Sequence, residues 1–185
     1  MLAFLSVIEN DVVRSHLEEL YLLYNKELVH VANKILKDYH EAEDIVQTAF
    51  IKVADYLDEN IDVKCNKTKG LIVIIVRNLS INQYNKRKRR ATANIDDLTN
   101  VISDESEVTP EINVLRLDLS QEIARLLDNI NEGYADILTL KYLYEYSDKE
   151  IAEILSMSEG SVRTKLTRAR QACKDVLGGE RYEYA

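Results

Sequence analysis

Residues 147–179 read SDKEIAEILSMSEGSVRTKLTRARQACKDVLGG, and this pattern predicts two helices joined by a short turn. Ser147 and Glu150 have the spacing of a capping box. In such a box the serine hydroxyl accepts an early backbone N–H and the glutamate reaches back to the serine N–H. We expect a short helix after this box, a turn at residues 156–158, and a second helix that runs to about Leu177.

The second of these helices has two different faces. Its apolar residues have helical spacing and cluster within about 60° of one another on the helix circumference. They are Val162, Leu166, Ala169 and Cys173. A roughly opposite face carries Arg163, Thr164, Thr167 and Arg168. We expect Ser158 to cap this helix and the pair Gly178–Gly179 to stop it.

This arrangement is typical of a helix-turn-helix, whose second helix enters the major groove of DNA. Arginine on such a face can bond O6 and N7 of guanine, and threonine can touch a thymine methyl group. The structural alternative is a charged helix at the end of a bundle, because the helix dipole favours basic residues near a C-terminus. The capped first helix, the small Ala152 and the three-residue turn favour DNA binding.

The distribution of charge agrees with this interpretation, although the formal net charge of the 185-residue chain is −8. Residues 86–90 read KRKRR, and residues 159–177 contain five basic but only two acidic residues. Between them, residues 91–122 hold eight acidic residues and one basic residue. Two basic regions therefore flank an acidic middle, and local charge matters more for nucleic-acid binding than the sum.

The first half of the chain predicts a second group of helices. Apolar residues recur at helical spacing from Val13 to Ile35 and again in residues 41–57. Residues 70–76 read GLIVIIV, which suits a buried strand by propensity. An unpaired strand is unstable and no other segment resembles a partner, so we prefer a buried helix that continues towards Arg87.

The middle of the chain predicts a domain boundary. Residues 91–110 have no periodicity and many acidic residues, and Pro110 suits the first turn of a new helix. Helical spacing resumes from Ile112 to Ile130, and a further helix is expected at about residues 134–144. We therefore expect an all-α protein with two small helical domains joined by a flexible acidic linker. The expected segments are domain 1–92, linker 93–110, domain 111–178 and tail 179–185.

The remaining composition indicates a soluble, cytoplasmic protein without catalytic chemistry. The apolar N-terminus lacks a positive flank, and no apolar run is long enough to span a bilayer, so we expect no membrane contact. The two cysteines have no metal-ligand spacing and are expected to be reduced thiols. No histidine has a nucleophile nearby, and no glycine-rich phosphate loop occurs. We expect no enzyme activity, no cofactor and no metal, and the residues concerned are Cys65, Cys173, His16, His30 and His40.

Three segments together resemble a known family. AEDIVQTAFIKVADYL at residues 42–57 is similar to region 2.2 of extracytoplasmic-function (ECF) sigma factors of bacterial RNA polymerase. IIVRNLSINQYNKRKRR at residues 74–90 is similar to their regions 2.3 to 2.4, and residues 134–177 resemble their region 4. The resemblance covers nearly the whole chain in the family's order, with an acidic linker between the two halves. It is more specific than a helix-turn-helix alone, which many regulators share.

The resemblance implies partners and site residues. The first domain would dock on the clamp helices of the largest subunit of core RNA polymerase through Asp44, Gln47, Thr48 and Ile51. These four fall at i, i+3, i+4 and i+7, so one helix face can present them. The family also implies contact with the flap of the second polymerase subunit. An anti-sigma factor that masks the polymerase and DNA surfaces is expected as a further partner.

Promoter DNA would be contacted by both domains. In the first domain a set of polar and basic residues would meet the melted −10 element, and two of them lie in an expected loop at residues 64–69. The set is Asn66, Lys69, Arg77, Asn78, Asn82, Tyr84, Lys86 and Arg87. Basic groups would follow phosphates while aromatic or amide groups meet an extruded base. In the second domain the −35 duplex would meet Ser161, Arg163, Thr164, Lys165, Thr167, Arg168 and Arg170. Of these, Lys165 and Arg170 are expected at phosphates.

The chain departs from the family pattern at three positions. Leu71 stands where the family usually has tryptophan, Asn82 stands where it has aspartate, and Ser156 occupies a turn position that is usually glycine. The first two put the −10 specificity in doubt. If Ser156 is left-handed, serine costs about 1 kcal/mol there.

Two other functions remain as alternatives. A conventional helix-turn-helix regulator, acting as a dimer without polymerase, would leave residues 42–57 and 74–90 without a role. A protein-interaction module that never reads promoters would tolerate charge reversal at Arg163 and Arg168.

Overall fold

The computed structural model describes residues 2–57, 62–92 and 121–183, and it divides into two compact units, Met1–Val101 and Ile102–Ala185. Within the described residues every regular element is a helix and none is a strand. The expected all-α class is therefore confirmed. The expected linker at residues 93–110 and the beginning of the helix expected from Ile112 lie outside the described residues, and the expected domain limits stay a prediction.

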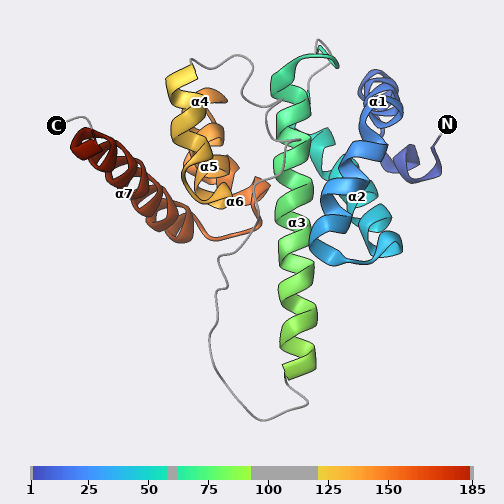
Figure 1. Ribbon diagram of the computed structural model, residues 1–185. Coiled ribbons are helices and arrows are strands. Elements are labelled where there is room, and N and C mark those ends of the chain that lie inside the picture. The colour runs from blue at the N-terminus through green and yellow to red at the C-terminus, as the bar shows by residue number, and fades with distance from the viewer. Residues whose placement is uncertain (1, 58–61, 93–120, 184–185) are drawn as a thin grey trace. The chain divides into compact units, whose positions relative to one another are not determined.

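The first unit is built from three long helices, α1 (Asp11–Leu36), α2 (Tyr39–Val53) and α3 (Asn66–Thr92). Two short 3₁₀ turns, η1 (Ala3–Val7) and η2 (Ala54–Tyr56), precede α1 and follow α2. The helices α1 and α2 lie against the first half of α3, and its second half extends beyond them (Figure 1).

Local sequence explains where α1 and α2 begin and end. The Asn10 side chain accepts hydrogen bonds from two backbone N–H groups of the first turn of α1, which satisfies donors that a helix start leaves open. Lys37 has a left-handed backbone with φ 55° and ends α1. The Asp38 side chain then accepts the N–H of Glu41 and starts α2. The two helices therefore form an antiparallel hairpin with a very short turn.

The ambiguous stretch GLIVIIV lies in α3, which confirms the preferred helix. Every residue from Gly70 to Arg77 is buried, whereas most residues from Ile81 to Arg90 are exposed. A helix satisfies its backbone hydrogen bonds internally, so it can be buried on all sides without a partner strand. The expected loop at residues 64–69 is wrong in part, because α3 already begins at Asn66.

The second unit contains α4 (Gln121–Asp128), α5 (Glu132–Leu138), a π-helical turn η4 (Thr139–Leu143), α6 (Asp148–Ile154) and α7 (Glu159–Glu183). The helices α4, α5 and α6 all pack against α7 (Figure 1). The helix expected at residues 134–144 is confirmed as α5 and η4.

The helices α6 and α7 form the predicted helix-turn-helix. Ser147 and Glu150 make the capping box, with the Ser147 backbone N donating to Glu150 Oε2 at 2.8 Å and the Glu150 backbone N donating to Ser147 Oγ at 3.2 Å. Ser156 has φ 52°, so its turn is left-handed, as the family's usual glycine indicated. The Ser158 hydroxyl accepts the backbone N–H of Ser161 at 3.2 Å and caps α7.

The predicted end of α7 is wrong. Gly178 and Gly179 do not stop this helix, which continues to Glu183. Glycine weakens a helix interior by about 1 kcal/mol but ends a helix only where it takes a left-handed backbone. No described glycine has a positive φ.

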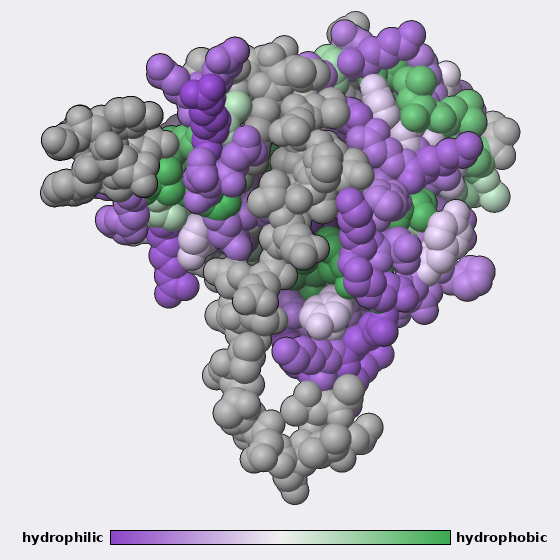
Figure 2. All heavy atoms as spheres, viewed as in Figure 1, coloured by the Kyte–Doolittle hydropathy of each residue, from purple (hydrophilic) through white to green (hydrophobic). Residues whose placement is uncertain are grey.

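The surface is that of a polar protein. Figure 2 shows hydrophilic residues over most of the described surface on the visible face, with hydrophobic residues in separate patches. Among the described residues, no helix is both long and apolar enough to cross a membrane. The same residues contain no group of three or more acidic, histidine or cysteine side chains placed to hold a metal ion. Cys65 and Cys173 are free thiols.

Candidate nucleic-acid interface

The two faces predicted for α7 are both present. On the inner face Val162, Leu166 and Ala169 are at most 1% exposed, while Cys173 is half-buried. On the opposite face four side chains of the predicted set are exposed, and they are Arg163, Thr164, Thr167 and Arg168. Burial of the inner face fixes the rotation of α7 about its axis and so presents these four to solvent.

The two threonines already use their hydroxyl groups. Thr164 Oγ1 donates to the carbonyl of Gly160 at 2.9 Å, and Thr167 Oγ1 donates to the carbonyl of Arg163 at 3.0 Å. Such i to i−4 bonds are common for threonine in helices. With the hydroxyl engaged, the methyl group is the part of each side chain best suited to an apolar contact.

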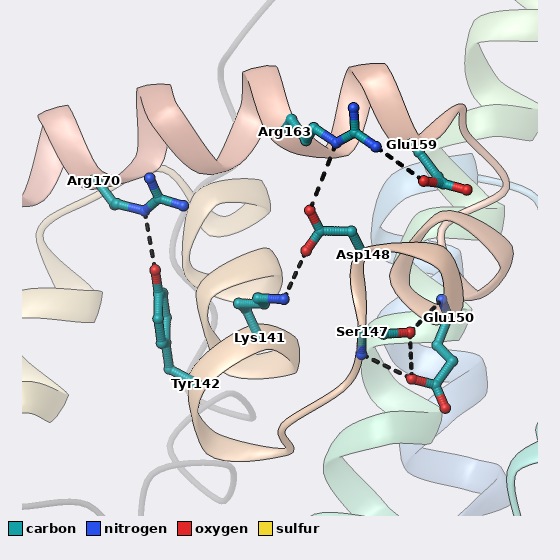
Figure 3. Close-up of polar contacts among 8 residues, drawn as sticks. All are labelled: Lys141, Tyr142, Ser147, Asp148, Glu150, Glu159, Arg163 and Arg170. Carbon is teal, nitrogen blue, oxygen red and sulfur yellow. Dashed lines mark hydrogen bonds and ion pairs between the residues drawn. The ribbon is translucent and has the colours of Figure 1, made fainter.

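An ionic network fixes Arg163 at the start of α7 (Figure 3). Asp148, the first residue of α6, accepts a hydrogen bond on Oδ1 from Lys141 Nζ at 2.7 Å. Its Oδ2 lies 3.9 Å from Arg163 Nε, and Arg163 Nη2 donates to Glu159 Oε2 at 3.1 Å. The Lys141 hydrogen bond, with the charges of Lys141, Arg163 and Arg170, lowers the pKa of Asp148 against a smaller opposing effect of desolvation.

A second contact positions Arg170, whose Nε donates to the Tyr142 hydroxyl oxygen at 3.0 Å. Both side chains are exposed, so the pair lies on the surface of the second unit.

The remaining predicted residues of α7 are Ser161 and Lys165. Ser161 is exposed, and its hydroxyl lies 2.9 Å from that of Ser158. Lys165 is half-buried rather than fully exposed. All seven residues predicted for −35 DNA therefore lie on α7, but they have different surroundings.

Sequence reasoning missed three residues of this surface: Lys141, Tyr142 and Asp148. The i,i+4 pair of Glu159 and Arg163 has a helical signature that spacing could have revealed. The contact between Tyr142 and Arg170 spans 28 positions and the contact between Asp148 and Arg163 spans 15, so no local pattern marks them. They depend on how η4 and α6 pack beside α7.

The second half of α3 forms the other basic surface. Asn82, Lys86 and Arg87 are exposed, and Tyr84 is 42% exposed. Arg87 Nη1 donates to Glu41 Oε2 at 2.7 Å and to the carbonyl of Leu36 at 3.2 Å. The charge of Arg87 is therefore partly neutralised by Glu41, in the first turn of α2.

Other residues predicted for −10 DNA are not gathered at this surface. Arg77 is 3% exposed and lies among the buried residues of α3, so the expectation that it faces DNA does not fit its burial. Asn78 is half-buried one residue further along. Arg77 is the first polar side chain after the apolar run, and the expectation for it came from the resemblance to the ECF family.

Asn66 and Lys69 lie in the first turn of α3. At 1.5 Å per residue, Asn66 is about 27 Å along the axis from Tyr84. Lys69 Nζ is 2.8 Å from Glu27 Oε2 and 5.0 Å from the centre of the Tyr24 ring, and its side chain is 12% exposed. The structure therefore does not bring Asn66 and Lys69 into one pocket with the far end of α3.

A separate surface lies on α2. Asp44 and Thr48 are exposed, Ile51 is 37% exposed and Gln47 is half-buried. Thr48 Oγ1 donates to the Asp44 carbonyl at 2.8 Å, an i to i−4 bond within the helix. The opposite face of α2 packs into the core through its buried residues, which are Ala42, Val46, Ala49, Phe50 and Val53. The predicted face is thus present and accessible.

Comparison with known proteins assigns both halves of the chain. The family model for sigma-70 region 2 matches residues 20–90, and the model for sigma-70 region 4 matches residues 120–173. The chain is 30% identical over 163 residues to the ECF RNA polymerase sigma factor SigW of Bacillus subtilis, covering 84% of this chain and 85% of that protein. It is 27% identical over 158 residues to SigM of the same organism, covering 85% and 93%.

A solved structure of the sigma factor RpoE with the anti-sigma factor NepR from Bartonella quintana is 20% identical, with a TM-score of 0.36 over 87% of this chain and 96% of that one. The match to region 2 disfavours a conventional helix-turn-helix regulator, because a regulator that acts without polymerase does not need a region 2 domain. The chain therefore belongs to the ECF sigma factors and directs promoter-specific transcription as a sigma factor.

Proposed function

We propose that this sigma factor uses three separate surfaces, one for core RNA polymerase and two for promoter DNA. The observation that carries the proposal is the face of α7, where Arg163, Thr164, Thr167 and Arg168 are exposed opposite the apolar face that packs into the core. A helix held in this way can enter the major groove with its side chains already directed at the bases.

The α7 face would read the −35 duplex. Arg163 and Arg168 are suited to guanine, and the methyl groups of Thr164 and Thr167 to thymine. Arg170 would bond a phosphate while its Nε remains on the Tyr142 hydroxyl, because a guanidinium has five donors and that contact uses one. Ser161, exposed in the first turn, and Lys165 complete the proposed set as phosphate contacts.

The far half of α3 would bind the melted −10 element. Its exposed basic run tracks phosphates, and the half-exposed ring of Tyr84 offers a surface on which an unpaired base can stack. Asn82 provides amide groups for the edge of an extruded base, and Asn78 lies one turn earlier. Asn66 and Lys69 would meet the strand elsewhere, since they lie at the opposite end of α3.

The exposed face of α2 would dock on the clamp helices of the largest polymerase subunit. Ile51 provides apolar area and Asp44 a charge, with Gln47 and Thr48 between them on the same face. The second unit would contact the flap of the second subunit.

As part of polymerase the protein would act in the cytoplasm, without catalytic activity of its own. An anti-sigma factor would hold the protein inactive by covering the polymerase-binding and DNA-binding surfaces.

Run-off transcription with bacterial core polymerase and fragmented genomic DNA of the host, followed by sequencing of transcript starts, tests the proposal. We expect discrete starts preceded by shared −35 and −10 motifs. Asp44→Arg should abolish these starts by preventing binding to core polymerase. Arg168→Glu should abolish them while binding to core polymerase is unchanged.

Matched variants control for the change of charge. Glu19→Arg and Lys26→Glu reverse exposed charges on α1, outside all three surfaces, and should leave transcription unchanged. Absence of discrete starts with the wild-type chain, together with no binding to core polymerase, would refute the proposal.

A further inference from the structure

We propose that Asp148 is a positioning residue of the DNA-reading face: it orients Arg163 and Lys141 and limits their attraction to phosphates, so that binding depends on base contacts. This inference rests on the proposed −35 role of α7. Asp148 lies on α6, outside the set of residues directed at bases, and it acts through its two cationic neighbours.

The geometry places one carboxylate between two cations from different elements. Oδ1 of Asp148 is bonded to Lys141 of η4 at 2.7 Å, and Oδ2 faces Arg163 of α7 at 3.9 Å. The Asp148 and Lys141 side chains are each 30% exposed, whereas Arg163 is 66% exposed. An aspartate is ionised at neutral pH, and the lowered pKa of Asp148 extends this ionisation to more acidic conditions, so the side chain carries a full negative charge at this position.

Local helix capping does not account for this arrangement. An acidic residue in the first turn of α6 is favoured by the helix dipole, but that role requires no particular partner. Ser147 and Glu150 already complete the cap of α6 with two reciprocal bonds. The direction of the Asp148 side chain, towards Lys141 and Arg163, is therefore a separate feature.

A fixed negative charge at this position affects two kinds of DNA binding differently. Non-specific binding arises from cations that meet phosphates and release counterions, so it weakens when a cation already has an anionic partner. A hydrogen bond to a base edge is short-range and directional, so it benefits from an arginine whose direction is fixed. Asp148 lies nearest to Nε of Arg163 and Glu159 nearest to Nη2, so the two carboxylates approach different nitrogens of the guanidinium.

The test compares wild type, Asp148→Asn and Asp148→Glu in the full-length chain. On a scrambled 30-bp duplex, Asp148→Asn should bind about 3- to 10-fold more tightly at about 0.1 M salt. The slope of log K against log salt should steepen by about 0.9 for each cation that gains a phosphate. Asp148→Glu retains the carboxylate and should restore the wild-type slope. Asp175→Asn removes one exposed charge elsewhere on α7 and should leave the slope unchanged.

Base selectivity is measured with holoenzyme reconstituted from core polymerase, selecting from a duplex pool randomised over the −35 region. Wild type and Asp175→Asn should enrich the same motif, and Asp148→Asn should lose preference at the position that Arg163 reads. Thermal midpoints equal to that of wild type would show that none of these changes in binding or selectivity comes from unfolding.

Three outcomes would overturn the inference. If wild type is selective but Asp148→Asn keeps both the salt slope and the motif, Asp148 does not position these cations. If Asp148→Asn weakens binding equally to all sequences and lowers the thermal midpoint, its role is only structural. If wild-type holoenzyme shows no −35 preference, the proposed function of α7 fails, and the inference fails with it.

Discussion

The helices α3 and α7 are both long and both carry a basic surface, but they divide burial from exposure in different directions. In α3 the division runs along the axis, because Gly70–Arg77 is buried on all sides and the last turns are exposed. In α7 the division runs around the axis, because Val162, Leu166 and Ala169 are buried and the opposite face is exposed. Helix shape alone therefore does not determine how a basic helix presents itself to DNA.

The difference suits two kinds of DNA. The far half of α3, free of packing on most sides, can present side chains to a single strand that wraps around it. The α7 face is fixed in rotation by the core beneath it, which suits the regular edges of duplex base pairs. Each surface also has one arginine held by a carboxylate from another helix, Arg87 by Glu41 and Arg163 by Asp148.

The largest expected effect concerns the buried half of α3. Ile74 is fully buried, so Ile74→Ala should lower the free energy of unfolding by about 2–5 kcal/mol. Ile81, only seven residues further on, is 39% exposed, and Ile81→Ala should cost less than about 1 kcal/mol. Denaturant unfolding of both variants measures the contrast. Equal losses would contradict a division of α3 along its axis.

The next effect distinguishes the two proposed DNA surfaces. Arg168→Ala should cost about 1–3 kcal/mol of discrimination at one base position of the −35 element. Lys86→Ala should weaken binding to all sequences alike and reduce the salt slope by about 1. Holoenzyme binding to matched and mismatched promoters, at several salt concentrations, separates the two patterns. A position-specific loss with Lys86→Ala would remove the distinction between α3 and α7.

The same difference explains how much the sequence alone could predict. The helix α7 was recognisable because Val162, Leu166 and Ala169 repeat at helical spacing, whereas the uniformly buried half of α3 has no such periodicity. Its assignment as a helix depended on the lack of a partner strand. The end of α7 was mispredicted because Gly178 was read as a stop signal. The role of Asp148 was missed, because its partners Lys141 and Arg163 come together only through tertiary packing.

A third effect is a dependence of the stability of the second unit on pH. A hydrogen bond from Lys141 lowers the pKa of Asp148, and hydrogen bonds from Ser147 lower that of Glu150. Both pKa values are therefore lower folded than unfolded, where they are about 3.9 and 4.3. The stabilisation they give is complete above about pH 5 and is lost as pH falls through the folded values.

Denaturant midpoints measured between pH 7 and pH 3 test this dependence. Replacing both residues, as Asp148→Asn with Glu150→Gln, should flatten the acid side of the profile for the second unit. The profile of the first unit should be the same in wild type and in the double variant. An unchanged acid profile in the double variant would show that other carboxylates dominate.

The smallest effect sharpens the description of α7 itself. Because Gly178 lies within the helix with open space around it, Gly178→Ala should raise the free energy of unfolding by up to about 1 kcal/mol. If the helix ended at this glycine with a left-handed backbone, alanine would instead be destabilising. Thermal or denaturant unfolding gives the sign directly.

Site-specific photo-crosslinking in the promoter-bound holoenzyme tests the division between the two surfaces most directly. A photoreactive amino acid would replace Tyr84 on α3 in one variant and Thr167 on α7 in another, both exposed in this structure. We predict that the Tyr84 probe reacts with the single-stranded non-template strand of the −10 element, and only after the promoter melts. The Thr167 probe should react with the −35 duplex before and after melting. Crosslinks from both probes to one promoter element, or a Tyr84 crosslink that does not require melting, would contradict the account.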